Sequence, residues 1–360
     1  MIPVTKPYLP SKDVFDNFVE GSWKRNWLTN SGPLVNELEL KLKEHLSLSH
    51  LLYVSNGTIA LQLALRSIAD EGEVITTPFS YIATTSSILW ERFTPVYADI
   101  DAATLNIDPA KIEEAITPDT VAILATHVFG NPCDIDAIDK IAARHNIKVI
   151  YDAAHCFGTT YKGKSVFDYG DISTVSFHAT KLFHTIEGGA VITQSAELLK
   201  KISFMANFGH NGPVDYEEVG INAKNSEFHA AMGLSNLLEV EEILACRKRL
   251  SKHYDSRLKS DKITYQSIQK GTGYNYAYYP VIIDSEELLE QILEALKSHK
   301  IFPRRYFHPS LNTVGLSNHQ DMSVSESISE RVLCLPLYHT LSKEEIDLIC
   351  RVILRTINYA

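Results

Sequence analysis

The chain has 360 residues, of which 45% are hydrophobic and 22% are charged, and its formal net charge at pH 7 is −10. This composition is typical of a globular protein with a large core, and the length favours two domains because single cores stop growing at about 250–300 residues. An acidic chain without a long run of Lys and Arg is a poor candidate for binding nucleic acid or an anionic membrane.

Targeting and cysteine patterns favour the cytoplasm. Residues 1–10 contain three prolines, one Lys and no apolar segment, so no signal peptide is predicted. No run approaches the roughly 18 apolar residues that a transmembrane helix needs. The five cysteines are scattered without a CxxC pair, which argues against structural zinc and a disulfide framework. We therefore expect a cytoplasmic protein with no metal site and no membrane partner.

Short apolar runs alternate with helical patterns through the first part of the chain. Helices are predicted at residues 34–47, 58–69 and 81–90, and after Asp134, which is a typical helix cap. Strands are predicted at residues 51–54, 73–76, 95–99, 120–126, 147–151, 172–177 and 190–193. Because several strands are apolar throughout, the alternation predicts an α/β fold with a mostly parallel sheet covered by helices on both faces.

The pattern changes after about residue 236. A long charged helix is predicted at residues 237–258, followed by a Tyr-rich strand at 274–283 and a helix with apolar residues between 288 and 296. Residues 303–323 are predicted to form a loop, and Ser342 is expected to cap a final helix. We interpret residues 1–239 as a large domain and residues 240–360 as a smaller α+β domain.

Polar residues follow several of the predicted strands, where parallel α/β sheets bind ligands. Gly57 and Thr58 begin a helix, whose free N–H groups can bind phosphate. Asp152 ends the strand at 147–151, and Lys181 comes shortly after the strand at 172–177. Taken singly, these residues could equally be an ordinary helix cap, a solvated carboxylate and a surface charge.

In combination, a phosphate-binding helix start, an Asp and a Lys 29 positions later are similar to the order found in fold-type I enzymes that use pyridoxal 5′-phosphate (PLP). Further motifs, spread over about residues 26–340, resemble the DegT/StrS-type nucleotide-sugar aminotransferases. The matching segments are Ser55-Asn56-Gly57-Thr58, Tyr81-Ile82-Ala83-Thr84, Pro95 through Asp99-Ile100-Asp101, Asp152-Ala153-Ala154-His155, Ser176 to Lys181, Glu187-Gly188-Gly189, Gly220-Ile221-Asn222, Glu227 to Gly233 and Leu335-Pro336-Leu337.

The resemblance implies PLP as the cofactor and two catalytic residues. Lys181 would bind the cofactor covalently and shuttle a proton between it and the substrate carbon. Asp152 would face the pyridine nitrogen and keep it protonated, which makes the ring an electron sink.

The resemblance also implies how the rest of the cofactor is bound. Tyr81 would stack on the ring, although it could also be a core residue, and His155 would hydrogen-bond the phenolic oxygen. Gly57, Thr58 and Ser176 would bind the phosphate. Asn222 would reach the phosphate from the neighbouring subunit, so we expect a homodimer with shared active sites.

Glutamate and a nucleotide keto-sugar are the substrates that the resemblance implies. His178 and Glu187 follow the pattern Ser-Phe-His-x-x-Lys with Glu-Gly-Gly, which is similar to members that aminate C4 of the sugar. We therefore expect transfer to the C4 keto group of a nucleotide-linked 4-keto-6-deoxyhexose, with dTDP-4-keto-6-deoxyglucose as the first choice. The product would serve surface polysaccharide (lipopolysaccharide O-antigen) biosynthesis.

Several alternatives stay open at this point. The chain could act at C3 of a dTDP-3-keto-6-deoxyhexose, or it could be a non-catalytic protein with a PLP-enzyme fold. His178 could be a structural histidine. Arg304, Tyr306 and His308 lie where relatives line the sugar-nucleotide cleft, but they could also form a solvated basic loop. Nothing in the motifs separates a dTDP-sugar from a UDP-sugar.

Overall fold

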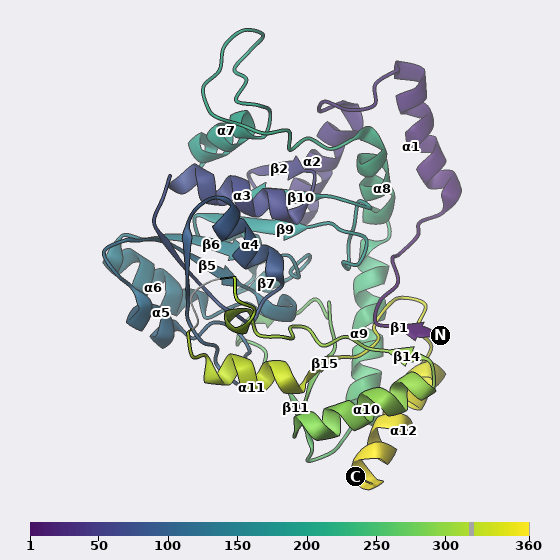
Figure 1. Ribbon diagram of the computed structural model, residues 1–360. Helices are drawn as coiled ribbons and strands as arrows, with labels where there is room; N and C mark the ends of the chain where they lie inside the picture. Colours follow the sequence, from purple (N-terminus) through teal and green to yellow (C-terminus); the bar gives the residue numbers. More distant parts are fainter. Residues whose placement is uncertain (317–319, 360) are drawn as a thin grey trace.

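The computed structural model describes residues 1–316 and 320–359, and Figure 1 shows its elements. A seven-stranded sheet forms the centre, in the order β2-β10-β9-β6-β5-β3-β4. Its neighbouring strands are parallel except where β10 pairs antiparallel with β2 and with β9. The strands are β2 (Leu51–Val54), β3 (Glu73–Thr76), β4 (Thr94–Tyr97), β5 (Thr120–Thr126), β6 (Lys148–Asp152), β9 (Ile172–Ser176) and β10 (Gly189–Ile192). This mostly parallel sheet confirms the predicted α/β fold.

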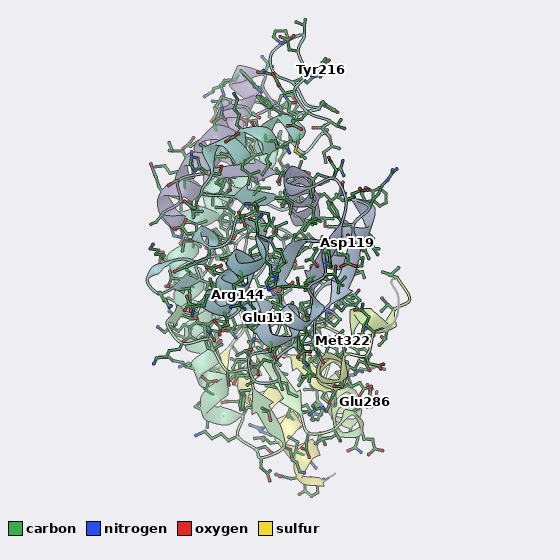
Figure 2. The ribbon with its side chains drawn as sticks, turned by 90° about the vertical axis from the view of Figure 1, so that its left-hand side faces the viewer. Glu113, Asp119, Arg144, Tyr216, Glu286 and Met322 are labelled. Carbon is green, nitrogen blue, oxygen red and sulfur yellow. The ribbon has the colours of Figure 1, made fainter. Side chains whose placement is uncertain are left out.

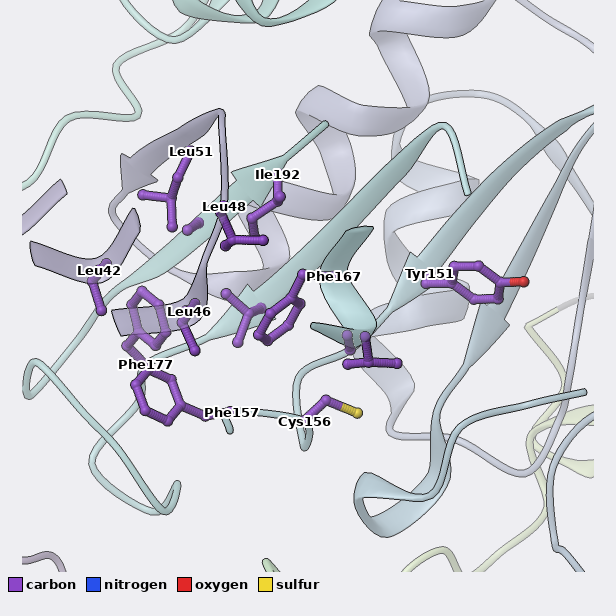
Figure 3. Close-up of a cluster of buried hydrophobic side chains, with 14 of the residues drawn as sticks. Leu42, Leu46, Leu48, Leu51, Tyr151, Cys156, Phe157, Phe167, Phe177 and Ile192 are labelled. Atoms are coloured by element: carbon purple, nitrogen blue, oxygen red, sulfur yellow. The ribbon is translucent and has the colours of Figure 1, made fainter. Parts of the chain in front are cut away.

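Helices cover both faces of this sheet. Successive strand residues point to opposite faces, so Ile75 packs in one hydrophobic cluster and Val74 in another. The first cluster, part of which Figure 3 shows, contains residues of α2 (Pro33–Leu46), α5 (Pro109–Ala115), α6 (Ile135–His145) and α8 (Glu227–Leu237). The second contains residues of α3 (Gly57–Ile68), α4 (Ile82–Trp90) and α7 (Ala196–Met205). Double burial explains why these strands are apolar throughout.

The C-terminal part has its own sheet and its own hydrophobic cluster. The sheet has the order β11 (Ile263–Tyr265), β13 (Pro280–Ile283) and β15 (Val332–Cys334). The helices that contribute to the cluster are α9 (Val240–Arg257), α10 (Glu286–Ser298) and α12 (Lys343–Tyr359). The first strand of the chain, β1 (Ile2–Pro3), also lies here and pairs parallel with β14 (Ile301–Phe302). The proposed boundary between residues 239 and 240 stays a prediction.

The remaining elements are short or peripheral. A small sheet joins β12 (Thr272–Gly273), β7 (Thr160–Tyr161) and β8 (Lys164–Ser165). The other helices are α1 (Lys12–Arg25) and α11 (Ser323–Arg331), with short 3₁₀ helices at Val128–Gly130, Val166–Asp168 and Leu311–Thr313. None of the helices in the described residues is long and apolar enough to cross a bilayer.

Two expectations from the sequence need correction. The prediction of a Tyr-rich strand at 274–283 is wrong for its first half, because only Pro280–Ile283 is a strand. Tyr276 has a left-handed φ of 54°, which interrupts the extended backbone. The loop at 303–323 contains the 3₁₀ helix and the start of α11, and its residues 317–319 lie outside the described part of the chain.

Candidate active site

A cavity of about 360 Å³ lies at the carboxyl ends of β2, β5, β6 and β9. All the predicted site residues except Asn222 and His308 line this cavity. They are Gly57, Thr58, Tyr81, Asp152, His155, Ser176, His178, Lys181, Arg304 and Tyr306. A larger open groove of about 790 Å³ runs along α9 but is lined by none of the predicted site residues. Chemistry rather than volume therefore identifies the smaller cavity as the candidate site.

The start of α3 forms one end of the cavity. The Asn56 side chain accepts a hydrogen bond from the Ile59 N–H at 2.8 Å, which caps the helix. A Cβ atom on Gly57 would lie 2.9 Å from Cβ of Ser176, and one on Gly189 would lie 2.5 Å from the Asn56 carbonyl carbon. Glycine at both positions lets the helix start approach the end of β9 and the beginning of β10 closely. The resulting small cradle, with helix N–H groups and the Ser176 side chain around it, fits a phosphate group.

Asp152, the last residue of β6, is buried, with 6% of its surface exposed. Its Oδ2 accepts a hydrogen bond from the Thr84 hydroxyl at 2.8 Å, and its Oδ1 accepts one from the Ala154 N–H at 3.1 Å. Burial raises the pKa of the Asp152 carboxyl, while these hydrogen bonds and the charge of Lys181 act in the opposite direction. A buried carboxylate of this kind fits a cationic ring nitrogen.

Lys181 lines the same cavity on the loop between β9 and β10. Burial lowers the pKa of its ammonium group, and Asp152 is the main charge that acts against this effect. A lowered pKa increases the fraction of neutral amine, which is the form that attacks an aldehyde. The position and the electrostatics of Lys181 therefore fit covalent attachment of a cofactor.

His155 is held in a neutral form that can donate a hydrogen bond. Its Nδ1 accepts the Phe129 N–H at 3.2 Å, and burial holds the pKa of the imidazole well below its usual value. A neutral imidazole that accepts at Nδ1 carries its proton on Nε2. The ring lies nearly parallel to Phe129 and Phe307, at centroid distances of 6.3 and 5.9 Å. These contacts fix the ring, so Nε2–H is available to an oxygen atom of a bound molecule.

Tyr81 and His178 lie at more exposed parts of the cavity wall. Tyr81 is 60% exposed, which rules out the alternative that it is a core residue. His178 Nε2 lies 3.5 Å from Oε1 of Glu187, and its Nδ1 lies 2.8 Å from the Thr180 hydroxyl. The sequence assigned His178 and Glu187 to one pattern without predicting contact between them, and in the structure they form a pair on the wall of the cavity that Lys181 lines.

Asn222 and His308 do not line the cavity. Asn222 closes a hairpin at residues 207–222 by pairing with Asn207, and its expected role on a neighbouring subunit stays a prediction. His308 accepts a hydrogen bond from Arg305, which in turn pairs with carboxylates of α10. Arg304 and Tyr306, by contrast, do line the cavity.

Three hydroxyl residues near Asp152 were not predicted as site residues. Thr126 ends β5 at the carboxyl edge of the sheet, so the rule that selected Asp152 could also have selected it. Ser80 lines the cavity just before Tyr81. Thr84 was quoted within a motif, but no sequence pattern indicates its contact with a residue 68 positions away.

Three features meet at the carboxyl edge of the sheet: a phosphate cradle at the start of a helix, a buried Asp, and a Lys whose pKa is lowered. Together they are typical of a PLP-dependent enzyme of fold type I. The chain belongs to the DegT/DnrJ/EryC1/StrS aminotransferase family, whose sequence profile matches residues 11–354. It is a PLP-dependent sugar aminotransferase, and the non-catalytic alternative is excluded.

Known relatives agree with this assignment. The chain is 41% identical over 355 residues to the dTDP-4-amino-4,6-dideoxy-D-glucose transaminase of Shigella dysenteriae, covering 96% of each chain. It is 39% identical to the enzyme of the same name from Escherichia coli, covering 98% of each chain. Among solved structures, DesI in the presence of its TDP-sugar product has a TM-score of 0.93 at 31% identity, covering 99% of this chain and 93% of that one.

Proposed function

We propose that the chain transfers the amino group of glutamate to the C4 keto group of a nucleotide-linked 4-keto-6-deoxyhexose, with dTDP-4-keto-6-deoxyglucose as the first choice. The observation that carries the proposal is the His178–Glu187 pair on the wall of the Lys181 cavity, since both residues belong to the pattern that favours C4. Full-length similarity to two dTDP-4-amino-4,6-dideoxy-D-glucose transaminases supports the same choice. The product would enter surface polysaccharide (O-antigen) biosynthesis in the cytoplasm.

Two residues perform the proton chemistry in this proposal. When bound, PLP carries the amino group and withdraws electrons from the reacting carbon. The Lys181 amine binds the cofactor and then moves a proton to and from the substrate carbon, a role for which its lowered pKa suits it. The Asp152 carboxylate holds a proton on the pyridine nitrogen.

The other residues of the cavity hold and orient the bound molecules. The Gly57 and Thr58 amides and the Ser176 hydroxyl would bind the cofactor phosphate, Tyr81 would stack on the ring, and His155 Nε2–H would donate to the phenolic oxygen. Arg304 and Tyr306 then face the sugar nucleotide, and a guanidinium group is well suited to a diphosphate.

The decisive experiment offers the 4-keto sugar nucleotide and its 3-keto isomer side by side with glutamate, and identifies the products by NMR. We expect amination of the 4-keto sugar only, and no product from the matched Lys181→Ala control. Amination of the 3-keto isomer alone would replace the C4 assignment by the C3 alternative. Parallel reactions with dTDP- and UDP-linked sugars identify the nucleotide.

We also propose that the working unit is a homodimer in which each 207–222 hairpin completes the partner's site. This hairpin projects beyond α7, with Tyr216 at its outer end (Figures 1 and 2). Val214, Tyr216 and Val219 are 78%, 65% and 93% exposed, which is unusual for apolar side chains that face water. A second copy of the chain would cover them.

Hybrid dimers test this arrangement. Lys181→Ala and Asn222→Ala subunits, inactive or weak alone, should regain activity when co-expressed, because one site of the hybrid is intact. Lys181→Ala mixed with Asp152→Asn is the matched control and should gain nothing, since both changes affect the subunit's own site. A fully active monomer in sedimentation would refute the proposal.

A further inference from the structure

Three buried hydroxyl groups connect to Asp152 in a line. The Thr84 hydroxyl lies 2.8 Å from Asp152 Oδ2, the Ser80 hydroxyl lies 2.8 Å from that of Thr84, and the Thr126 hydroxyl lies 3.0 Å from that of Ser80. Each of the three residues is at most 4% exposed. The line joins the residues before and within α4 to the ends of β5 and β6.

Hydrogen counting gives this line a direction. A hydroxyl has one hydrogen to donate, and Thr84 uses its own on the Asp152 carboxylate. Ser80 must therefore donate to Thr84, and Thr126 must donate to Ser80. In the reverse direction, which a proton on Asp152 Oδ2 would require, the Thr126 hydrogen has no acceptor among the contacts of the described residues. The arrangement in which all three hydrogens point toward Asp152 is the one that leaves none unpaired.

Aligned hydroxyl groups stabilise negative charge at the end of the line. Chains of hydrogen bonds polarise one another in a low-dielectric interior, and a bond to a charged acceptor is stronger than one between neutral groups. The Asp152 carboxylate requires such stabilisation, because burial raises the pKa of this carboxyl. The Ala154 N–H on Oδ1 supplies a second donor.

We propose that Thr84, oriented by Ser80 and Thr126, is a positioning residue that keeps the Asp152 carboxylate charged and aimed at the cofactor's ring nitrogen. This inference rests on the role proposed above for Asp152. Thr84 is 0% exposed and does not line the cavity, so it acts through Asp152 and not by touching a bound molecule.

Cofactor binding without turnover tests the proposal. The apoprotein is titrated with PLP and with the carbocyclic analogue that has a carbon in place of the ring nitrogen, in wild type, Thr84→Val, Thr84→Ser and Asp152→Asn. Valine keeps the shape of threonine and removes the hydroxyl, whereas serine keeps the hydroxyl. The measured quantity is the dissociation constant of the analogue divided by that of PLP. Changes that weaken binding of both molecules equally cancel in this ratio.

We expect Thr84→Val to weaken PLP binding by roughly 10- to 100-fold, as for a lost hydrogen bond to a charged group, with little change for the analogue. Thr84→Ser should keep the wild-type ratio. If Asp152→Asn lowers the ratio but Thr84→Val leaves it unchanged, the proposal for Thr84 is overturned. An equal loss of affinity for both molecules in Thr84→Val counts as an unchanged ratio. If Asp152→Asn leaves the ratio unchanged, the assigned role of Asp152 itself fails.

Discussion

Two buried regions of this molecule differ in what they bury. The candidate active site buries Asp152, His155 and Thr84, whose polar groups must each find a hydrogen-bond partner to offset the loss of water. The C-terminal cluster buries side chains such as Leu289, Ile292 and Ile349, each 0% exposed. Burial of an aliphatic side chain stabilises a fold by about 1.5–3 kcal/mol. Changes at the site should therefore affect catalysis, whereas changes in the cluster should affect stability.

The largest effect is expected for Lys181→Ala. Loss of both covalent attachment and proton transfer should lower turnover by about 10⁴-fold or more. The thermal unfolding midpoint of the apoprotein should stay close to that of wild type, because burial does not favour a lysine ammonium group. Activity assays with glutamate and calorimetry measure the two effects, and turnover above a trace would contradict the assignment.

Asp152→Asn should also separate activity from stability. An amide lacks the negative charge that keeps the ring nitrogen protonated, so kcat should fall by about 100-fold or more while PLP still binds. Near-normal activity would show that Asp152 has no catalytic role.

The difference in stability between the wild-type and Asp152→Asn apoproteins should depend on pH with a definite sign. Because burial raises the pKa of Asp152 in the folded state, the unfolded chain loses this proton first as the pH rises. Wild type therefore loses stability as the pH rises from the unfolded pKa, near 3.8, through the folded value, and the asparagine variant lacks this loss. Urea unfolding across that range should show a difference that grows in favour of the variant.

Ile292→Ala tests the other region. Removing this buried side chain from α10 should lower the free energy of unfolding by about 2–5 kcal/mol, with kcat unchanged within about twofold. Gln291→Ala, an exposed neighbour, is the matched control and should change the free energy by less than about 0.5 kcal/mol. A large loss of kcat in folded Ile292→Ala protein would remove the distinction between the two regions.

The smallest effect is expected at a helix cap. Ser285 accepts a hydrogen bond from the Leu288 N–H at 3.2 Å and begins α10. Ser285→Ala should lower the free energy of unfolding by about 1 kcal/mol, and Ser285→Asp should restore it. Urea denaturation followed by circular dichroism can resolve this difference, and an alanine variant as stable as wild type would show that the cap is unimportant.

The sequence predicted the central sheet well because doubly buried strands are continuous apolar runs with a distinct signal. It missed α1, α5, α7, α8 and α11, and two of these helices show different reasons for the failure. In α1 the apolar stripe of Phe15, Phe18 and Val19 is short and only partly buried, so its signal is weak. In α8 eight of the eleven residues are buried, among them Ala230 and Gly233, so helical periodicity disappears.

The same physics limits prediction of the site. Asp152 and Thr126 end strands, so a rule about strand ends reaches them from sequence. Thr84 lies on a helix that packs across the sheet edge, and the pairing of His178 with Glu187 depends on how one loop closes. Such contacts follow from the packed structure and have no local sequence signal.

The pairing of β1 with β14 has a consequence for biosynthesis. Ile2 lies opposite Ile301 in this parallel pair, so the partner of β1 is synthesised about 300 residues later. A ribosome that adds about 5–20 residues per second needs roughly 15–60 s to travel between them. Throughout that interval β1 of the nascent chain has no strand partner, so the β1–β14 pair can form only after Phe302 has been synthesised.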